Sequence, residues 1–185
     1  MHDCQVIDGC LILFPYRSAE HERIVGNLLD LFLTVVPAGV EVLAGVAVQA
    51  PGDSRPVPDG LVTTLPPESR DPALPGELVH TVVEVVTPHS RYLDRTRKSD
   101  LYAEAGVPCY WRVEPERWRT YRGEVPVIVV RIREHGRWRV LLAPAGRTTE
   151  LPVAVGPGTA GAPATVPLAI DPARLLSRRT RHELG

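Results

Sequence analysis

The chain has 185 residues, of which 44% are hydrophobic and 23% are charged. This composition suits one domain with a real hydrophobic core and excludes a disordered polypeptide. The formal net charge is −1, so a generally basic footprint for nucleic acid is absent and any phosphate-binding surface must be local.

Cysteine usage and hydropathy point to a cytoplasmic protein. Cys4, Cys10 and Cys109 are widely spread and form no CxxC pair, which argues against a disulfide framework or a zinc site and favours a reducing compartment. No apolar run approaches the length of a membrane span, and the opening residues lack the features of a signal peptide. We therefore expect a cytoplasmic protein without a membrane partner.

The first third of the chain predicts a strand, a helix and a second strand. Residues 5–14 alternate loosely and end at Pro15, which is typical of a strand that stops there. Residues 18–36 carry apolar side chains at helical spacing behind Ser18, a good N-cap. Residues 40–50 are rich in β-branched side chains and predict another strand.

The middle of the chain predicts two strands that flank a long loop, followed by a helix. Asp59 enters a short strand, residues 66–77 form a polar, proline-rich loop, and residues 78–86 are apolar almost throughout, like a central strand covered on both faces. A helix then begins near Asp94 or Thr96, ends at Gly106 and leads into a strand over residues 108–116.

The last third predicts an antiparallel meander, built from residues 118–123, 125–134 and 136–143. Residues 143–167 are rich in Pro, Ala, Gly and Thr and have no periodicity, which predicts a loop or a loosely held extension. A short strand at 167–170 and a helix capped by Asp171 close the chain. The expected fold class is α/β (α+β), a mixed curved sheet flanked by helices, in one domain over residues 1–185.

Glu84 is the most informative residue, because it interrupts an apolar strand. An ionised carboxylate in a dry strand costs several kcal/mol unless a cation or hydrogen bonds compensate it. Lys98 or a bound metal ion would provide that compensation. An exposed position at the edge of the sheet, or a purely structural ion pair, would also explain this residue.

Asp59 is a second carboxylate at the mouth of a strand, directly after Pro58. Alone it would be an ordinary turn aspartate. Together with Glu84, however, it can converge from a neighbouring strand, and such oxygen ligands with a backbone carbonyl and water suit Mg²⁺. A metal ion there would polarise a phosphoryl oxygen and generate a nucleophilic water, and a nearby lysine would stabilise the developing negative charge.

Four segments in this order resemble the Uma-type family of restriction endonuclease-like proteins, which belongs to the PD-(D/E)XK nuclease superfamily. They are His21, "PDG" at 58–60, "VVEVVTPHS" at 82–90 and "DRTRKSDLYAEAGVPCYWRVEP" at 94–115. The resemblance covers roughly residues 5–175. It implies a restriction endonuclease-like fold and a divalent metal cofactor, Mg²⁺ with Mn²⁺ as a substitute.

The resemblance also implies roles for matching positions. Asp59 and Glu84 would bind the metal ion, together with the backbone carbonyl of Val85, and Lys98 would be catalytic. The plain superfamily motif places its lysine two residues after the glutamate, where this chain has Val86. In this branch the lysine has moved to the next helix, although a solvated helix residue is the simpler explanation of a lone Lys98.

Other polar residues near these positions are weaker candidates. His21 would contact phosphate or act as an acid or base, or else cap its helix, and Glu20 is a less favoured metal ligand. Packing against Lys98 explains Tyr102, and the turn after the central strand explains His89 and Ser90. Tyr110 and Trp111 are expected in the core. A local basic cluster for the phosphate backbone comprises Arg91, Arg95 and Arg97.

Two main functions fit these features, and a metal-dependent hydrolase of a small phosphate ester is a third, less favoured one. The first is a Mg²⁺-dependent endonuclease that hydrolyses phosphodiester bonds in DNA with Asp59, Glu84, Lys98 and His21. The second is a nuclease-fold binding or regulatory module with weak or no catalysis, which the near-neutral charge and Val86 favour. A homodimer would allow both strands to be cut, and residues 125–130 could pair at a sheet edge, although burial explains that run more simply.

Overall fold

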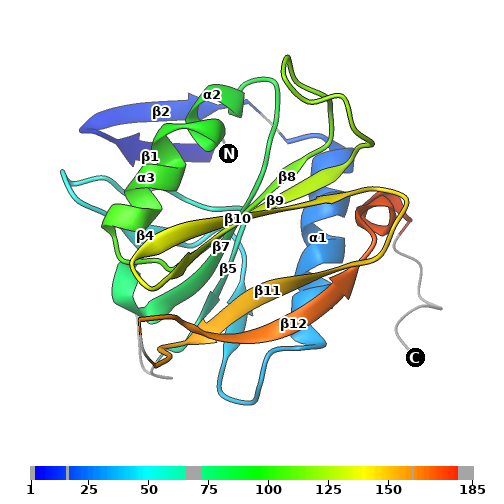
Figure 1. Cartoon of the computed structure of the whole chain (residues 1–185). Helices are drawn as coiled ribbons and strands as arrows, with labels where there is room; N and C mark the ends of the chain where they lie inside the picture. The colour runs from blue at the N-terminus through cyan, green and yellow to red at the C-terminus, as the bar shows by residue number, and fades with distance from the viewer. Residues whose placement is uncertain (1–2, 16, 66–71, 160, 179–185) are drawn as a thin grey trace.

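The computed structural model describes residues 3–15, 17–65, 72–159 and 161–178. Within these ranges a mixed sheet has the strand order β10-β9-β8-β7-β5-β3, and three further strand pairs surround it (Figure 1). Strands β7 and β8 run parallel, whereas their other neighbours run antiparallel. The predicted mixed α/β fold is therefore confirmed.

The elements have the following bounds. The strands are β1 (Asp3–Ile7), β2 (Cys10–Phe14), β3 (Glu41–Leu43), β4 (Ala47–Gln49), β5 (Gly60–Thr63), β6 (Ala73–Pro75), β7 (Val79–Val85), β8 (Cys109–Glu114), β9 (Val127–Glu134), β10 (Arg137–Pro144), β11 (Thr149–Gly156) and β12 (Ala164–Ile170). The helices are α1 (Ala19–Leu33), α2 (Arg91–Arg95) and α3 (Arg97–Glu104), with 3-10 turns η1 (Gly76–Leu78) and η2 (Pro172–Leu176).

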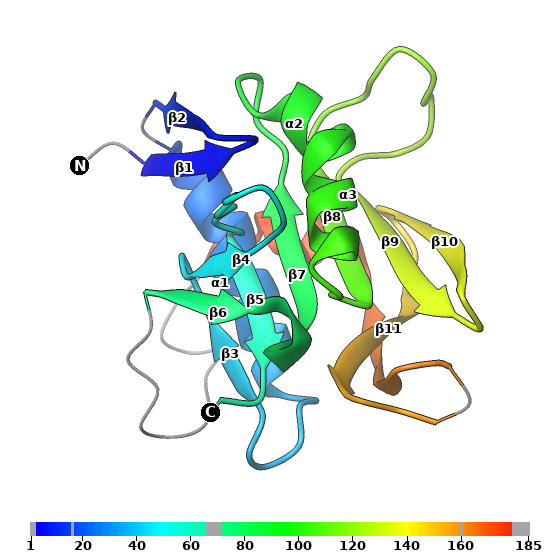
Figure 2. The same cartoon turned by 90° about the vertical axis from the view of Figure 1, so that its left-hand side faces the viewer.

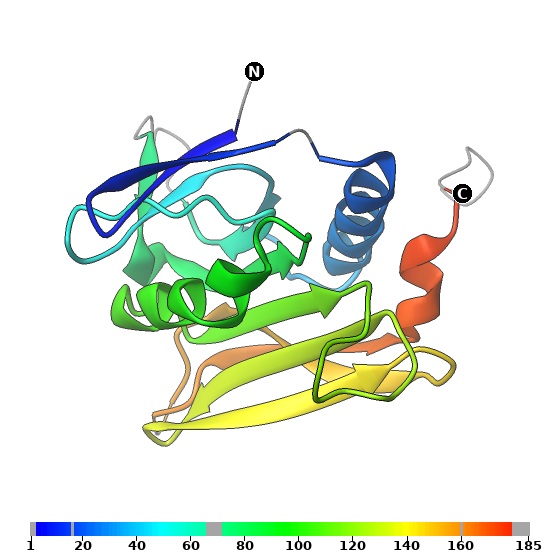
Figure 3. The same ribbon diagram turned by 90° about the horizontal axis from the view of Figure 1, so that it is seen from above.

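Helix α1 and the β11–β12 hairpin cover one face of the sheet. The apolar stripe of α1, which includes Leu28 and Phe32, packs with Trp111 of β8 in the larger core cluster, together with β11 and β12. The rings of Phe32 and Trp111 meet edge to face with centroids 5.0 Å apart. Figure 3 shows η2 beside α1, where Asn27 donates hydrogen bonds to the carbonyls of Leu175 and Ser177.

Helix α3 and the β4–β6 pair cover the opposite face, as Figure 2 shows. Their smaller core cluster includes Val48, Leu74, Val82, Tyr102 and Tyr110. Because successive side chains of a strand point to opposite faces, Val83 and Val85 of β7 face α1 while Val82 and Glu84 face α3. Strand β7 is thus buried on both faces, as its apolar sequence predicts.

Several sequence-based boundaries need correction in the first half of the chain. Residues 5–14 form a hairpin rather than one strand, because Asp8 and Gly9 both adopt positive φ and turn the chain. Residues 40–50 are split between two sheets at Gly45, whose φ is +66°. The predicted loop at 66–77 contains β6 and η1 in its second part, whereas residues 66–71 lie outside the described residues.

The second half differs in three places. The helix predicted to begin near Asp94 or Thr96 is α3, which follows Thr96, and the separate short helix α2 precedes it because Thr96 leaves helical geometry at φ −124° and ψ −89°. Residues 118–123 form no strand. The prediction of a loop across 143–167 is wrong, because β11 and β12 form an antiparallel hairpin there whose inward side chains belong to the core.

The C-terminal helix is shorter than predicted. Asp171 caps it as expected, since its carboxylate accepts from the backbone N–H of Ala173, but the element is the 3-10 turn η2. Strand β9 lies between β8 and β10, so residues 125–130 offer no free edge for pairing between chains. The predicted homodimer would need another surface.

Ser18 fixes the start of α1 and thereby the position of His21. Its hydroxyl accepts a hydrogen bond from the backbone N–H of His21 at 3.1 Å. We expect Ser18→Ala to lower the free energy of unfolding by about 1 kcal/mol, whereas Ser18→Gly costs only a few tenths. Urea unfolding of the two variants checks this, and a Ser18→Ala protein as stable as the wild type would contradict it.

Candidate active site

The candidate site lies at the carboxyl end of β7, where elements from both faces of the sheet meet. It is a cavity of about 240 Å³. Its walls come from the β1–β2 hairpin, the start of α1, the segment before β5, the end of β7 and the start of α3. The lining residues are Gln5, Phe14, Pro15, Arg17, Ser18, His21, Asp59, Glu84, Val85, Thr87, Pro88, His89, Ser90 and Lys98.

Asp59 is held where β5 begins beside β7. Its backbone N–H donates to the carbonyl of Val83 at 3.0 Å, and its Oδ2 accepts from the backbone N–H of Val85 at 2.7 Å. Gly60 follows because a Cβ there would lie 2.4 Å from Leu29 of α1. The missing side chain lets α1 approach this end of the sheet closely, and His21 of α1 reaches the same carboxylate.

Two basic groups face Asp59. Arg17 Nη1 lies 3.0 Å from Oδ1, and His21 Nε2 lies 3.2 Å from Oδ2. Burial opposes ionisation of Asp59, but the hydrogen bond from His21 and the charge of Arg17 outweigh it and lower the pKa of this carboxyl. Burial likewise opposes a charge on His21, yet the Asp59 carboxylate raises the pKa of the imidazole. Each group thus favours the charged form of the other.

Glu84 is 2% exposed and points toward α3. Its Oε1 accepts from Lys98 Nζ at 2.9 Å and from the Tyr102 hydroxyl at 2.7 Å. Burial raises the pKa of Glu84 to about 8 in spite of the lysine, helped by the charges of Asp94 and Asp59. Near neutral pH this site therefore retains a proton that an exposed glutamate would release.

Lys98 is the only lysine in the chain, whose other cationic side chains at neutral pH are arginines. It is 2% exposed and also lies 3.4 Å from Oδ1 of Asp94, one helical turn earlier in sequence. Burial opposes its charge, but Glu84, Asp94 and Asp59 together raise the pKa of the ammonium group. A solvated helix residue is thus excluded, and Lys98 is a buried cation between carboxylates.

The structure brings together most of the residues that the sequence singled out. Asp59, Glu84, Val85, Lys98 and His21 all line the one cavity. His89 and Ser90 line it as well, and Ser90 accepts from the backbone N–H of Thr87, as a turn residue does. Tyr110 and Trp111 are buried in the core as expected.

Three candidates lie elsewhere or act differently. Glu20 is exposed and lines a neighbouring cavity instead. Arg97 binds Asp8 and Glu104, so the predicted cluster of Arg91, Arg95 and Arg97 is divided. Tyr102 does more than pack beside Lys98, because its hydroxyl contacts Glu84 directly.

The sequence analysis missed three residues of the site. Asp94 precedes Lys98 by four positions, and this spacing alone could have indicated the contact. Arg17 carries no comparable signal, because it lies before the helix cap. Phe14, whose ring lies 5.7 Å from Lys98 Nζ, reaches the site only because the β1–β2 hairpin folds back toward it.

The donor set suits a hard divalent cation. Two carboxylates and the backbone at Val85 line one cavity. The charge of Asp59 disfavours ionisation of Glu84, so a cation bound between them would relieve this electrostatic cost. Among the described residues no group of three or more His, Cys, Asp or Glu side chains is arranged around a metal position. A backbone carbonyl and water would have to complete the coordination.

Comparisons with known proteins identify the family of the chain and a solved structure with a similar fold. The family described as "Uma2: Putative restriction endonuclease" matches residues 2–158, and the chain belongs to that family. Its fold is similar to the crystal structure of "a putative nuclease belonging to DUF820" from Anabaena variabilis, with a TM-score of 0.61 and 15% identity over 81% of this chain and 80% of the other. No curated protein matches the chain. In the described part, no helix is long and apolar enough to cross a membrane.

Proposed function

We propose that the chain is a Mg²⁺-dependent endonuclease that hydrolyses phosphodiester bonds in DNA. The observation that carries this proposal is the meeting of Asp59, Glu84 and Lys98 in a single cavity at the end of β7. Membership of a restriction endonuclease family supports a nucleic-acid substrate.

Each residue has a defined task in this proposal. Asp59, Glu84 and the carbonyl of Val85 would hold Mg²⁺ or Mn²⁺, which polarises a phosphoryl oxygen and lowers the pKa of a bound water. The Lys98 ammonium stabilises negative charge that develops on the phosphate, and its burial strengthens that interaction. His21, which lines the same cavity, orients Asp59 and would donate a proton or contact phosphate.

A nuclease-fold module without catalysis is the second candidate. The Arg17–Asp59 contact of 3.0 Å favours it, because this ion pair already neutralises one proposed metal ligand. Cleavage of linear and plasmid DNA with Mg²⁺, Mn²⁺ or chelator, combined with calorimetric metal titration, tests both candidates. Metal binding with cleavage supports the endonuclease, whereas the absence of metal binding at millimolar concentration rejects it in favour of the module.

Metal affinity should depend on pH because the ion competes with a proton on Glu84. Burial sets the pKa of Glu84 at about 8, so below that value a proton must leave before the ion binds. We expect the association constant for Mg²⁺ to rise by about tenfold per pH unit between roughly pH 6 and 8 and then level off. Calorimetric titrations across this range measure the slope.

Tyr102→Phe is the matched control for this pH dependence. The Tyr102 hydroxyl donates to Glu84 Oε1 and therefore favours the ionised carboxylate. Its removal should raise the pKa of Glu84 further and move the levelling point to higher pH. A pH-independent affinity in both proteins would show that Glu84 does not bind the ion.

A further inference from the structure

A second, larger cavity adjoins the candidate active site. It has a volume of about 660 Å³ and shares Ser18, His21, Val85, Thr87 and Pro88 with the first cavity. Its outer wall is formed by α2 and by the segment after β8. We call it the arginine–tryptophan pocket, after the lining residues Arg91, Arg95, Arg117, Trp118 and Arg119.

The buried carboxylate of Glu114 fixes the arginine side chains behind the wall of this pocket. Glu114 is 1% exposed and accepts two hydrogen bonds from Arg95, at 2.9 and 2.7 Å. Arg112 Nε lies 2.9 Å from the same carboxylate. The fixed Arg95 guanidinium lies over the ring of Trp118 at 5.5 Å, so that planar cation and indole stand together in the wall.

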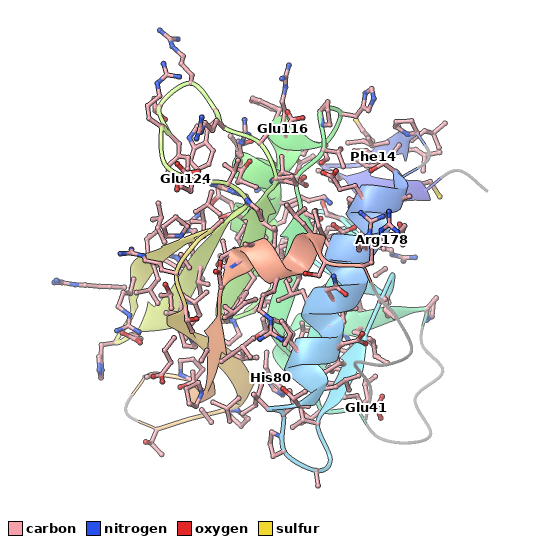
Figure 4. The ribbon with its side chains drawn as sticks, turned by 90° about the vertical axis from the view of Figure 1, so that its right-hand side faces the viewer. Phe14, Glu41, His80, Glu116, Glu124 and Arg178 are labelled. Carbon is pink, nitrogen blue, oxygen red and sulfur yellow. The ribbon has the colours of Figure 1, made fainter. Side chains whose placement is uncertain are left out.

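The loop that carries Trp118 is held by aromatic stacking. Trp118 and Tyr121 are stacked with centroids 4.5 Å apart and planes 13° from parallel. Figure 2 shows this loop, between β8 and β9, arching beside α2. In Figure 4, Glu116 and Glu124 of the loop lie at the same end of the molecule as Phe14, and Glu41 and His80 lie at the other. This loop therefore forms one wall of the arginine–tryptophan pocket, next to the candidate active site.

The charges of the pocket suit a ligand with few phosphates. Arg91 and Arg119 form no ion pair with another described residue, so both are available to an external anion. Glu20 and Glu116 also line the pocket, and these carboxylates would repel a dense array of phosphates. One or two phosphate groups next to the scissile bond match this balance better than the full backbone of a duplex.

The planar side chains of Trp118 and Arg95 indicate whether the bound nucleic acid is paired or unpaired. Bases in a duplex stack on one another and their faces are hidden, whereas an unpaired base can stack on an indole or a guanidinium plane. We propose that the arginine–tryptophan pocket binds an unpaired nucleotide that flanks the scissile phosphate. Because Tyr121 and Arg95 already cover the Trp118 ring, the base stacks on the Arg95 guanidinium that Trp118 supports, and the phosphate binds Arg91 and Arg119. The substrate class is therefore a DNA strand with unpaired bases. This inference rests on the proposed cleavage site next to the pocket.

Binding without metal tests the pocket separately from catalysis. The probe is a fluorescein-labelled thymidine octanucleotide, titrated with the protein in chelator and followed by fluorescence anisotropy. We expect Trp118→Ala to weaken binding by about tenfold, because it removes the ring that supports the Arg95 guanidinium under the stacked base. Arg119→Ala should weaken binding severalfold and reduce the slope of affinity against salt by about one. A duplex of the same length should bind more weakly to the wild type.

Trp138→Ala is the matched control. Trp138 lies on β10 and also contacts an arginine, with Arg131 5.3 Å from its ring, but it lines neither cavity. This variant should bind the octanucleotide like the wild type. If Trp118→Ala folds poorly, Trp118→Phe replaces it in the test. This variant keeps an aromatic ring in the loop and should retain most of the affinity for the octanucleotide. The inference would be overturned if all of these proteins bound the octanucleotide equally well. It would also be overturned if Trp118→Ala and Trp138→Ala lost the same affinity.

Hydrolysis of a small phosphodiester distinguishes failure of the pocket assignment from failure of the proposed endonuclease activity. Bis(4-nitrophenyl) phosphate has a scissile phosphate but no neighbouring nucleotide, so Trp118→Ala should hydrolyse it like the wild type while its KM for the octanucleotide rises. One outcome is that neither bis(4-nitrophenyl) phosphate nor the octanucleotide is hydrolysed, while binding of the octanucleotide still depends on Trp118. In that case the endonuclease proposal fails and the pocket assignment stands. If both are hydrolysed without any effect of Trp118, the pocket assignment fails and the endonuclease stands.

Discussion

Asp59→Asn and Glu84→Gln should each lower Mg²⁺-dependent DNA cleavage by on the order of 10³-fold, because each removes a charged ligand of the proposed ion. Both substitutions preserve the shape of a buried side chain. Asp59 would keep an oxygen for the Val85 N–H, and Glu84 one for Tyr102. The loss should therefore appear in kcat at temperatures where each variant is folded. Asp59→Asn also removes the charge that Arg17 and His21 face, so it should lower the melting temperature more than Glu84→Gln does. Initial rates on plasmid DNA at saturating Mg²⁺ measure it.

Glu41→Gln is the control for the same chemical change. Glu41 is exposed on β3, at the opposite end of the molecule from Phe14 (Figure 4). This variant should cleave like the wild type. Full activity in Asp59→Asn and Glu84→Gln would place the reaction elsewhere, whereas loss in all three variants would indicate damage unrelated to the site.

Lys98→Met should abolish cleavage and also destabilise the fold. It leaves Glu84 and Asp94 buried without their cation, and breaking a buried ion pair in this way costs about 3–5 kcal/mol. Burial raises the pKa of both carboxyl groups, so each can take up a proton and reduce this cost at low pH. The part of the destabilisation that comes from Glu84 should therefore grow as the pH rises through about 8, where Glu84 of the wild type loses its proton.

The sign of this pH dependence follows from proton binding. In the wild type without metal, folded Glu84 has a pKa of about 8 against an ordinary value of 4.5. Between these values the folded state holds more protons than the unfolded state, so Glu84 contributes stability at low pH that is lost as the pH rises. Removing Lys98 raises the folded pKa of Glu84 further, so in the variant the loss of stability continues above pH 8. Urea unfolding in chelator at several pH values measures the free energy of unfolding.

A double substitution separates the charge effect from lost packing. Glu84→Gln/Lys98→Met removes both partners, so it should be more stable than Lys98→Met alone at pH 8. A Lys98→Met protein with wild-type stability at every pH would contradict the buried ion pair. Cleavage by that protein within tenfold of the wild type would exclude Lys98 as a catalytic residue.

The central part of the fold was predictable because its sequence is compatible with few local structures. Strand β7 is apolar at almost every position, and α1 combines Ser18 as a cap with helical apolar spacing, so burial and capping both favour the observed elements. The order of Asp59, Glu84 and Lys98 along the chain correctly indicated a shared cavity. A carboxylate inside an apolar strand needs a partner, and that requirement is visible in the sequence.

The elements that were missed depend on turns and on distant contacts. The Asp8–Gly9 turn is a local hairpin signal that should have divided residues 5–14. Strands β11 and β12 carry no such signal, since prolines and small residues interrupt their pattern and only packing on the sheet selects the extended state. Arg17 reaches Asp59 through the path of the chain before α1, which local sequence does not specify.

The single lysine has a practical consequence for chemical labelling. Since the chain contains one lysine, its only amines are that of Lys98 and that of the amino terminus. Lys98 is 2% exposed and bound to a carboxylate, so an acylating reagent must enter the cavity and find the amine deprotonated before it can react. Acylation of this one position would therefore report how often the cavity opens, with no background from lysines on the outside of the molecule.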